Sequence, residues 1–169
     1  ALEMQQIFYQ SKFLSYLEKI VAKDSSKAQP MLKVWQGLRG VIQRFAEILI
    51  LNRHYCSAQS VIRSTFLSEE PQLEHYFNLP NRTQQQVRGE YDCLIYNWER
   101  KRLCVIEFKT YQQLDTSAQL AQVSLYGYML QQKQQVPVDS AVYCALPEFK
   151  EYYYDWEQLE STVHQLIHY

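Results

Sequence analysis

Hydrophobic positions recur at helical spacing through the first third of the chain. Between residues 3 and 22 apolar side chains return every three or four positions, which predicts an amphipathic helix. The polar segment KDSSKAQP at 23–30 predicts a turn or linker, and a second apolar stripe predicts another helix over 32–52. We therefore expect residues 1–30 to form a helical extension with its linker, and residues 31–169 to form the main domain.

The middle of the chain has the alternating pattern of a β-hairpin. Residues 91–96 and 102–110 are predicted strands, and the polar segment 97–101 between them is the predicted turn. In the second strand, RLCVIEFKT, apolar side chains point to both faces: Leu103 and Val105 to one, Cys104 and Ile106 to the other. Such a strand is typical of the middle of a sheet that is covered on both sides.

The segments around the hairpin predict a mixed α/β sheet with helices packed on it. A Gln-rich helix, two strands and a final helix are expected over 112–134, 140–146, 150–156 and 157–168. Before the hairpin, VIRSTFL suits either a short strand or a helix, and PQLEHYFNLP looks like a loop with a helical turn. Residues 84–88 are expected to open the first strand.

The composition favours one folded, cytoplasmic domain. An apolar fraction of 47% and an aromatic fraction of 14% in 169 residues allow a substantial core. There is no secretory pattern and no apolar run long enough to cross a bilayer, so no membrane partner is expected. The four cysteines lack CxxC spacing and are interpreted as buried free thiols rather than a disulfide or a zinc site.

The formal net charge of −1 hides an asymmetry between the two parts of the chain. Residues 1–63 carry nine Lys and Arg against four Asp and Glu, or +5, and residues 64–169 carry eight against fourteen, or −6. A cationic helical part beside an acidic part can attract a phosphate backbone to a carboxylate site. On charge alone, an ordinary solvated surface is the simpler interpretation.

Two charged residues interrupt the apolar second strand. Glu107 and Lys109 lie two positions apart and so share one face, and Asp92 arrives from the neighbouring strand. Buried charges are costly unless they are paired or bind a metal. Asp92, Glu107 and the backbone carbonyl of Phe108 can hold a hard divalent cation, the kind of ion that assists phosphodiester hydrolysis. Lys109 can position the attacking water or neutralise charge in the transition state, so all three side chains are candidate catalytic residues.

Three short motifs resemble those of the PD-(D/E)XK nuclease superfamily. They are GEYD at 89–92, IEFKT at 106–110 and QVSLY at 122–126, the last lying on the helix after the hairpin. With the GxxD and QxxxY patterns, the chain is similar to the RecB-like branch. That branch includes nuclease domains of recombination helicase-nucleases and the RecB-like nucleases of CRISPR adaptation.

The resemblance implies a restriction-endonuclease-like fold, with a mixed central sheet flanked by helices and an N-terminal helical extension. It implies that residues 31–169 are the nuclease-like domain, that DNA is the substrate, and that Mg²⁺ or Mn²⁺ is the cofactor. Gln122 and Tyr126 would then line the DNA path beside the metal site.

The sequence departs from the RecB-like pattern in two places. Members of the branch usually carry a metal-binding His four positions after a glycine on the helix before the hairpin, and here Arg44 follows Gly40 in that place. Glu47, on the same helix face, is a candidate replacement ligand, and Arg44 is a candidate DNA contact. Many members also hold an iron–sulfur cluster through one early and three late cysteines. Only Cys56 and Cys144 flank the motifs here, so no iron–sulfur cluster is predicted.

Three functions remain open on the sequence. The first is a metal-dependent DNA nuclease acting on DNA ends or single strands, in DNA repair or CRISPR adaptation, with a helicase or another DNA-processing subunit as partner. The second, prompted by Arg44, is a non-catalytic DNA-binding or assembly module on a nuclease fold. The third is a homodimeric endonuclease that is site-specific or cleaves junctions. Specificity resides in loops and partner surfaces, which these motifs do not describe.

Overall fold

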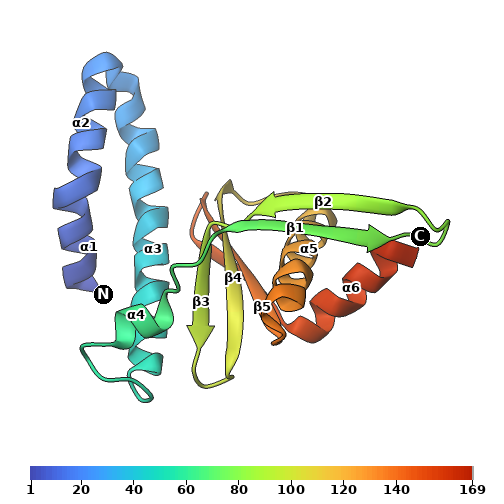
Figure 1. Ribbon diagram of the computed structural model, residues 1–169. Helices are drawn as coiled ribbons and strands as arrows, with labels where there is room; N and C mark the ends of the chain where they lie inside the picture. Colours follow the sequence, from blue (N-terminus) through green and yellow to red (C-terminus); the bar gives the residue numbers. More distant parts are fainter. Residues whose placement is uncertain (169) are drawn as a thin grey trace.

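Four strands form one mixed sheet with helices on both of its faces (Figure 1). The computed structural model describes residues 1–168. In their order across the sheet, the strands are β3 (Cys93–Asn97), β4 (Arg102–Tyr111), β5 (Val138–Leu146) and β6 (Lys150–Tyr154). β4 pairs antiparallel with β3 and parallel with β5, and β5 pairs antiparallel with β6. The predicted α/β fold with a mixed central sheet is confirmed, and the strand that carries Glu107 is an inner strand.

Different helices cover the two faces of β4. The α-helices of the described chain are α1 (Leu2–Phe8), α2 (Leu14–Lys23), α3 (Ala28–Asn52), α4 (Val61–Thr65), α5 (Thr116–Gln134) and α6 (Trp156–His168), and two of them, α3 and α5, pack on β4. Leu103 and Val105 pack in a core layer with α5, whereas Cys104 and Ile106 pack in a layer with α3. The predicted alternation of this strand is therefore confirmed. None of the helices in the described part of the chain is long and apolar enough to span a membrane.

Local signals position α5, the helix that carries the QxxxY motif. The carboxylate of Asp115 caps its start by accepting hydrogen bonds from two backbone amides of the first turn. In the middle of the helix, a Cβ added to Gly127 would lie 3.1 Å from Leu159 Cδ1 and 3.3 Å from the carbonyl oxygen of Val138. The glycine thus lets α5 lie close to both α6 and β5.

The N-terminal residues form a helical hairpin that projects from the sheet (Figure 1). A π-helical segment, Tyr9–Phe13, joins α1 and α2 into one helical arm beside α3. Trp35 of α3 holds this arm, with its ring 6.4 Å from that of Phe8 and 5.1 Å from that of Phe13. Both predicted helices are present. The second begins at Ala28 rather than at residue 32, because a single 3₁₀ turn is all that separates α2 from α3.

The segment before the hairpin differs from the expectation. PQLEHYFNLP was expected to be a loop with a helical turn but contains a strand, β1 (Gln72–Asn78). Residues 84–88 do not open the hairpin strand; they belong to β2 (Gln84–Glu90), which pairs antiparallel with β1 in a separate ribbon beside α5 (Figure 1). The sequence signal for this strand is the alternation that puts Leu73 and Phe77 on one face, which the structure buries.

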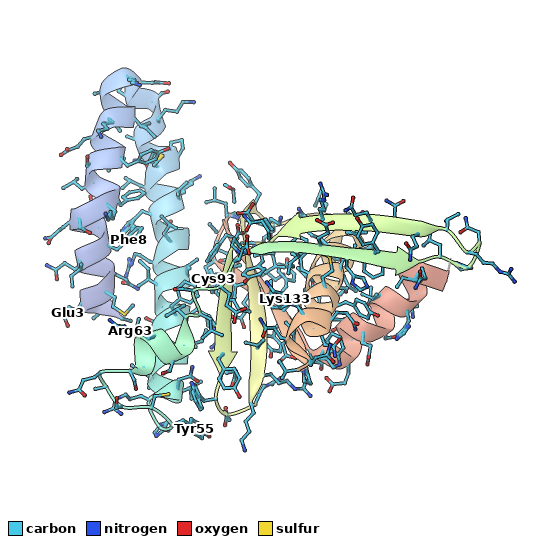
Figure 2. All side chains as sticks on the ribbon, in the orientation of Figure 1. Glu3, Phe8, Tyr55, Arg63, Cys93 and Lys133 are labelled. Carbon is cyan, nitrogen blue, oxygen red and sulfur yellow. The ribbon has the colours of Figure 1, made fainter. Side chains whose placement is uncertain are left out.

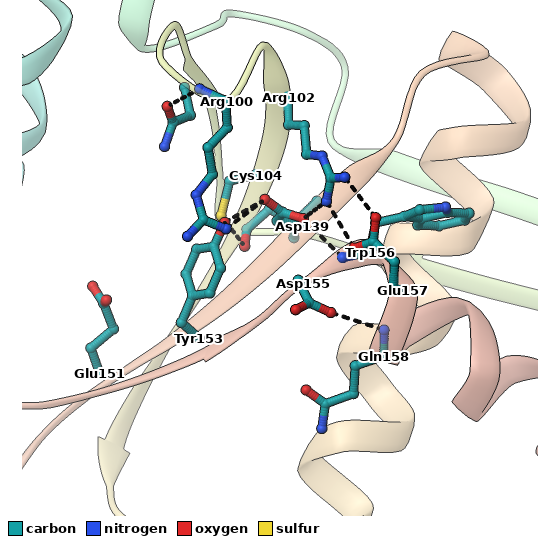
Figure 3. Close-up of polar contacts among 12 residues, drawn as sticks. Arg100, Arg102, Cys104, Asp139, Glu151, Tyr153, Asp155, Trp156, Glu157 and Gln158 are labelled. Atoms are coloured by element: carbon teal, nitrogen blue, oxygen red, sulfur yellow. Dashed lines mark hydrogen bonds and ion pairs between the residues drawn. The ribbon is translucent and has the colours of Figure 1, made fainter.

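A buried carboxylate, Asp139, ties together the end of the sheet where β4 and β5 begin (Figure 3). It accepts hydrogen bonds from Arg102 Nη1 at 3.2 Å, from the backbone amide of Trp156 at 2.8 Å and from the hydroxyl of Tyr153. Arg102 also pairs with Glu157 of α6, at 2.6 Å. Burial and the bond to Asp139 raise the pKa of Tyr153, so its hydroxyl remains a donor. The network joins β4, β5, β6 and α6.

Replacing Asp139 with alanine should destabilise the protein by about 3–5 kcal/mol, because several donors would lose one buried acceptor. Urea denaturation should show a lower midpoint with an unchanged slope. Asp155→Ala is the matched control: its carboxylate accepts from the Gln158 amide at 3.0 Å at the exposed start of α6, and losing such a cap costs about 1 kcal/mol. Equal losses in the two variants would contradict the role given to Asp139.

Candidate active site

The pairing of β3 with β4 ends just before the candidate residues. The last paired residues are Cys93 and Ile106, so β4 continues beyond its neighbour. There Asp92 Oδ2 accepts a hydrogen bond from the backbone amide of Phe108 at 2.7 Å. In a strand the amide and carbonyl of one residue point to the same side, so the Phe108 carbonyl also points toward the side that β3 leaves open. Sequence reasoning did not find this bond, which joins residues 16 positions apart.

Glu107 is a buried carboxylate with one unsatisfied oxygen. The residue is 4% exposed. Its Oε2 lies 3.6 Å from Lys109 Nζ, whereas its Oε1 is buried and has no hydrogen-bond partner among residues 1–168. Burial raises the pKa of Glu107 to about 7, the charge of Asp92 adds to this rise, and Lys109 opposes it. The site therefore holds two acidic groups and too little positive charge to balance them.

A chain of hydrogen bonds connects Lys109 to the QxxxY motif on α5. Lys109 Nζ donates to Gln122 Oε1 at 3.2 Å, and Gln122 Nε2 donates to the hydroxyl of Tyr126 at 3.2 Å. Because residues four apart lie on one helix face, the motif presents both side chains to β4. The structure thus brings Asp92, Glu107, Lys109, Gln122 and Tyr126 together at one end of the sheet.

The glycine of the GxxD motif makes room for the tyrosine of the QxxxY motif. A Cβ added to Gly89 would lie 2.3 Å from Tyr126 Cε1, far inside van der Waals contact. The ring of Tyr126 therefore packs directly on the backbone of β2 at this point. The two motifs are parts of one contact, which neither motif reveals by itself.

The two candidates from α3 have other partners. Arg44 Nε donates to Glu151 Oε2 of β6 at 2.6 Å, and Arg44 also lies 3.5 Å from Glu47. Glu47 accepts a further bond from Gln43 at 3.0 Å. Because α3 packs on the face opposite to Glu107, the structure does not bring Arg44 and Glu47 to Asp92 and Glu107. The α3 side chains beside the end of β4 are apolar, Phe45 among them.

The donor set at the end of β4 fits a hard divalent cation. In the described part of the chain, no three His, Cys, Asp or Glu side chains cluster as a ready metal site. Mg²⁺, however, needs only one or two carboxylates and keeps several waters. Asp92, Glu107 and the Phe108 carbonyl would supply three oxygens. The unpartnered Oε1 of Glu107 is the buried acceptor that such a cation would satisfy.

The mixed sheet thus carries two carboxylates and a lysine at the open end of its inner strand β4. The sequence model of the PD-(D/E)XK nuclease superfamily matches residues 6–167, so this chain belongs to that superfamily. Its members generally use divalent metal ions such as Mg²⁺. No protein of curated function matches the chain.

Two solved structures have limited similarity to the chain. A protein named SSO0001 is 16% identical with a TM-score of 0.38, over 77% of this chain and 71% of that one. A "Putative exonuclease" from Eubacterium rectale is 8% identical with a TM-score of 0.41, over 96% of this chain. The match covers 62% of the Eubacterium rectale chain.

Gly89 and Tyr126 should be energetically coupled. Gly89→Ala should cost about 1–3 kcal/mol of folding free energy, because the new methyl group overlaps the tyrosine ring. Combined with Tyr126→Ala, the loss should fall short of the sum of the two single losses by about 0.5–3 kcal/mol. Urea denaturation of the four proteins measures this coupling. A parallel cycle with Tyr128→Ala, whose ring packs on Phe77, should give additive losses, and additivity in the Tyr126 cycle would refute the contact.

Without divalent ions, Glu107 should make the protein less stable as pH rises from about 4.5 to about 7. Within this window the folded state keeps a proton on Glu107 that the unfolded chain has released, so raising the pH favours unfolding. The loss is at most about 3 kcal/mol, set by the size of the pKa shift. Urea denaturation in EDTA at several pH values checks this against Glu107→Gln, which lacks the titration. Identical pH profiles for the two proteins would show the idea to be wrong.

Proposed function

We propose that the chain is a divalent-metal-dependent deoxyribonuclease that hydrolyses phosphodiester bonds at DNA ends or in single strands. The observation that carries the proposal is the buried, half-satisfied Glu107 beside Asp92 and Lys109, at the open end of β4. Membership of a nuclease superfamily supports the same chemistry. A buried acid with a strongly raised pKa is more typical of a functional site than of a scaffold.

Asp92, Glu107 and the carbonyl of Phe108 would hold Mg²⁺ or Mn²⁺. Such an ion stabilises charge on the phosphate and makes a bound water acidic. Because Glu107 is buried, its charged form is poorly solvated, and a bound cation would stabilise that form. Asp92 is held in place by its bond to the Phe108 amide, which leaves its other oxygen available.

Lys109 would act on the phosphate or on the attacking water. Its ammonium group is a compact charge that can stabilise the anionic transition state or orient the nucleophile. Gln122 and Glu107 hold this group from two sides. Gln122 is thus a positioning residue for Lys109 as well as a candidate DNA contact with Tyr126. Arg44 and Glu47 are weaker candidates for DNA and metal binding, because both are engaged in ion pairs on the opposite face.

The motifs also suggest a setting for this activity. The GxxD and QxxxY patterns favour the RecB-like branch, in which nucleases work with helicases or other DNA-processing subunits in DNA repair or CRISPR adaptation. Such a role would place the protein in the cytoplasm. The packing of Tyr126 on Gly89 supports the branch assignment, because it makes the two patterns one structural unit.

Lys109→Ala and Asp92→Ala should each lower metal-dependent cleavage by about 100- to 10,000-fold, the usual contribution of a catalytic proton-transfer or charge-stabilising group. The assay uses end-labelled single strands, linear duplex and closed circular duplex with Mg²⁺ or Mn²⁺. Lys133→Ala, an exposed lysine near the far end of α5, is the matched control and should keep full activity. Unchanged cleavage in Lys109→Ala would sink the proposal.

A second candidate is a DNA-binding or assembly module without turnover. It is favoured by the apolar side chains that α3 presents to the end of β4, where a ligand would complete the metal site. In that case the parent protein would bind the same labelled strands without cutting them. A third outcome, cleavage of closed circles, would favour a dimeric site-specific or junction-cleaving enzyme over an end-dependent one.

A further inference from the structure

An apolar cavity of about 530 Å³ lies between α1, α3 and the end of β4. Its walls include Phe8 of α1, Val34 and Ile42 of α3, and Phe108 of β4. Phe8 is at the inner side of the helical arm, facing α3 (Figure 2). A cavity of this volume is in the range of small-molecule and cofactor sites, so it can hold a planar ring system.

Phe108 connects this cavity to the candidate active site. Its backbone amide binds Asp92, while its ring is 40% exposed and lines the cavity. The ring lies 6.1 Å from those of Phe45 and Tyr143, in edge-on geometry with both. Lys109 lines the same cavity. An occupant of the cavity would therefore lie beside the end of β4 that carries Glu107 and Lys109, on the α3 side of the sheet.

We propose that the cavity is a subsite for one unpaired nucleobase of the substrate strand, where that strand crosses the end of β4. The inference rests on the proposed nuclease function and deepens it by assigning a binding site to one base of the substrate strand. Stacking on aromatic side chains is the usual way in which proteins bind bases without reading their sequence. The sugar and phosphates stay outside the cavity, where Lys109 in its lining offers them a positive charge.

The subsite selects against paired bases. A base within a duplex must leave its stack and its partner before it can enter a pocket, and this costs a few kcal/mol. In a single strand or a frayed end the base is already unpaired, so this cost is largely absent. The cavity therefore makes single-stranded DNA, or the end of a strand, the preferred substrate.

The helical arm becomes part of the substrate site in this account. Met4 and Phe8 of α1 contribute to the cavity, so the cavity is complete only when α1 lies on α3. Gln5 holds α1 there: its side chain donates to the carbonyl oxygen of Arg39 at 3.1 Å and accepts from Arg39 Nε at 3.3 Å. The arm and the sheet thus form one binding surface.

The test compares the affinity of the protein for a ten-nucleotide thymidine strand and for an abasic strand of the same length, by fluorescence anisotropy in EDTA. The phosphates are identical, so the difference reports the bases alone. The thymidine strand should bind roughly ten-fold more tightly, the usual worth of one stacked base. Val34→Trp, which fills the cavity from α3, should abolish this preference. Met4→Trp, which fills the cavity from α1, should do the same.

Leu32→Trp is the matched control, because Leu32 lies on α3 but faces a different groove, formed with α2. This variant should keep the ten-fold preference. Equal affinity of the parent protein for both strands would overturn the subsite, and so would a preference that survives in both cavity-filling variants. Cleavage of the thymidine strand in Mg²⁺ is measured separately. Retained cleavage with no base preference removes the subsite alone, whereas base-dependent binding without cleavage removes the proposed nuclease activity.

Discussion

The arrangement of this protein depends on one carboxylate, Glu107, that is buried on an inner strand near one end of the sheet. Glu107 is 4% exposed, and an ionised acid at such a position is costly unless cations or hydrogen bonds satisfy it. Lys109 lies near one of its oxygens, and the other has no partner in the described residues. β3 ends early enough to leave this end of β4 open, and Asp92 replaces the missing strand partner. β4 is thus paired with β3 along its first part, and its candidate site lies where that pairing stops.

The alternation of side chains along β4 separates two tasks. Glu107 and Lys109 point to the α5 side, where Gln122 orients the lysine. Phe108, between them, points to the α3 side and lines an apolar cavity with the rings of that face. The candidate catalytic side chains and the proposed base subsite are therefore only one residue apart along β4, yet they lie on opposite faces of the sheet. The backbone amide of Phe108 binds Asp92 in the candidate site, whereas its ring lines the cavity.

The two ends of the sheet contrast in how their charges are satisfied. At one end Asp139 accepts hydrogen bonds from a strand side chain, a tyrosine and the first amide of α6, so the buried acid is fully partnered. At the other end, one carboxylate oxygen of Glu107 has no hydrogen-bond partner among the residues that the structure describes. A saturated network anchors a scaffold, whereas an unsatisfied buried acid is expected where a protein binds something. The Asp139 network therefore fixes the strands at one end of the sheet, and the same strands carry the candidate site at the other end.

Local sequence determined much of this protein, because periodicity and capping act over a few residues. The hairpin, the inner position of β4 and the selection of Asp92, Glu107 and Lys109 as candidates all follow from spacing alone, whereas α5 was expected from residue 112 and begins at Thr116, after its cap Asp115. Where the apolar alternation was short, as in β1, the expectation was wrong. Only tertiary structure decided that Arg44 meets Glu151, that Tyr126 packs on Gly89 and that α1 completes a cavity at Phe108. These contacts join residues far apart in the chain, and they depend on how the helices and the β1–β2 ribbon are placed against the sheet, which a local pattern does not encode.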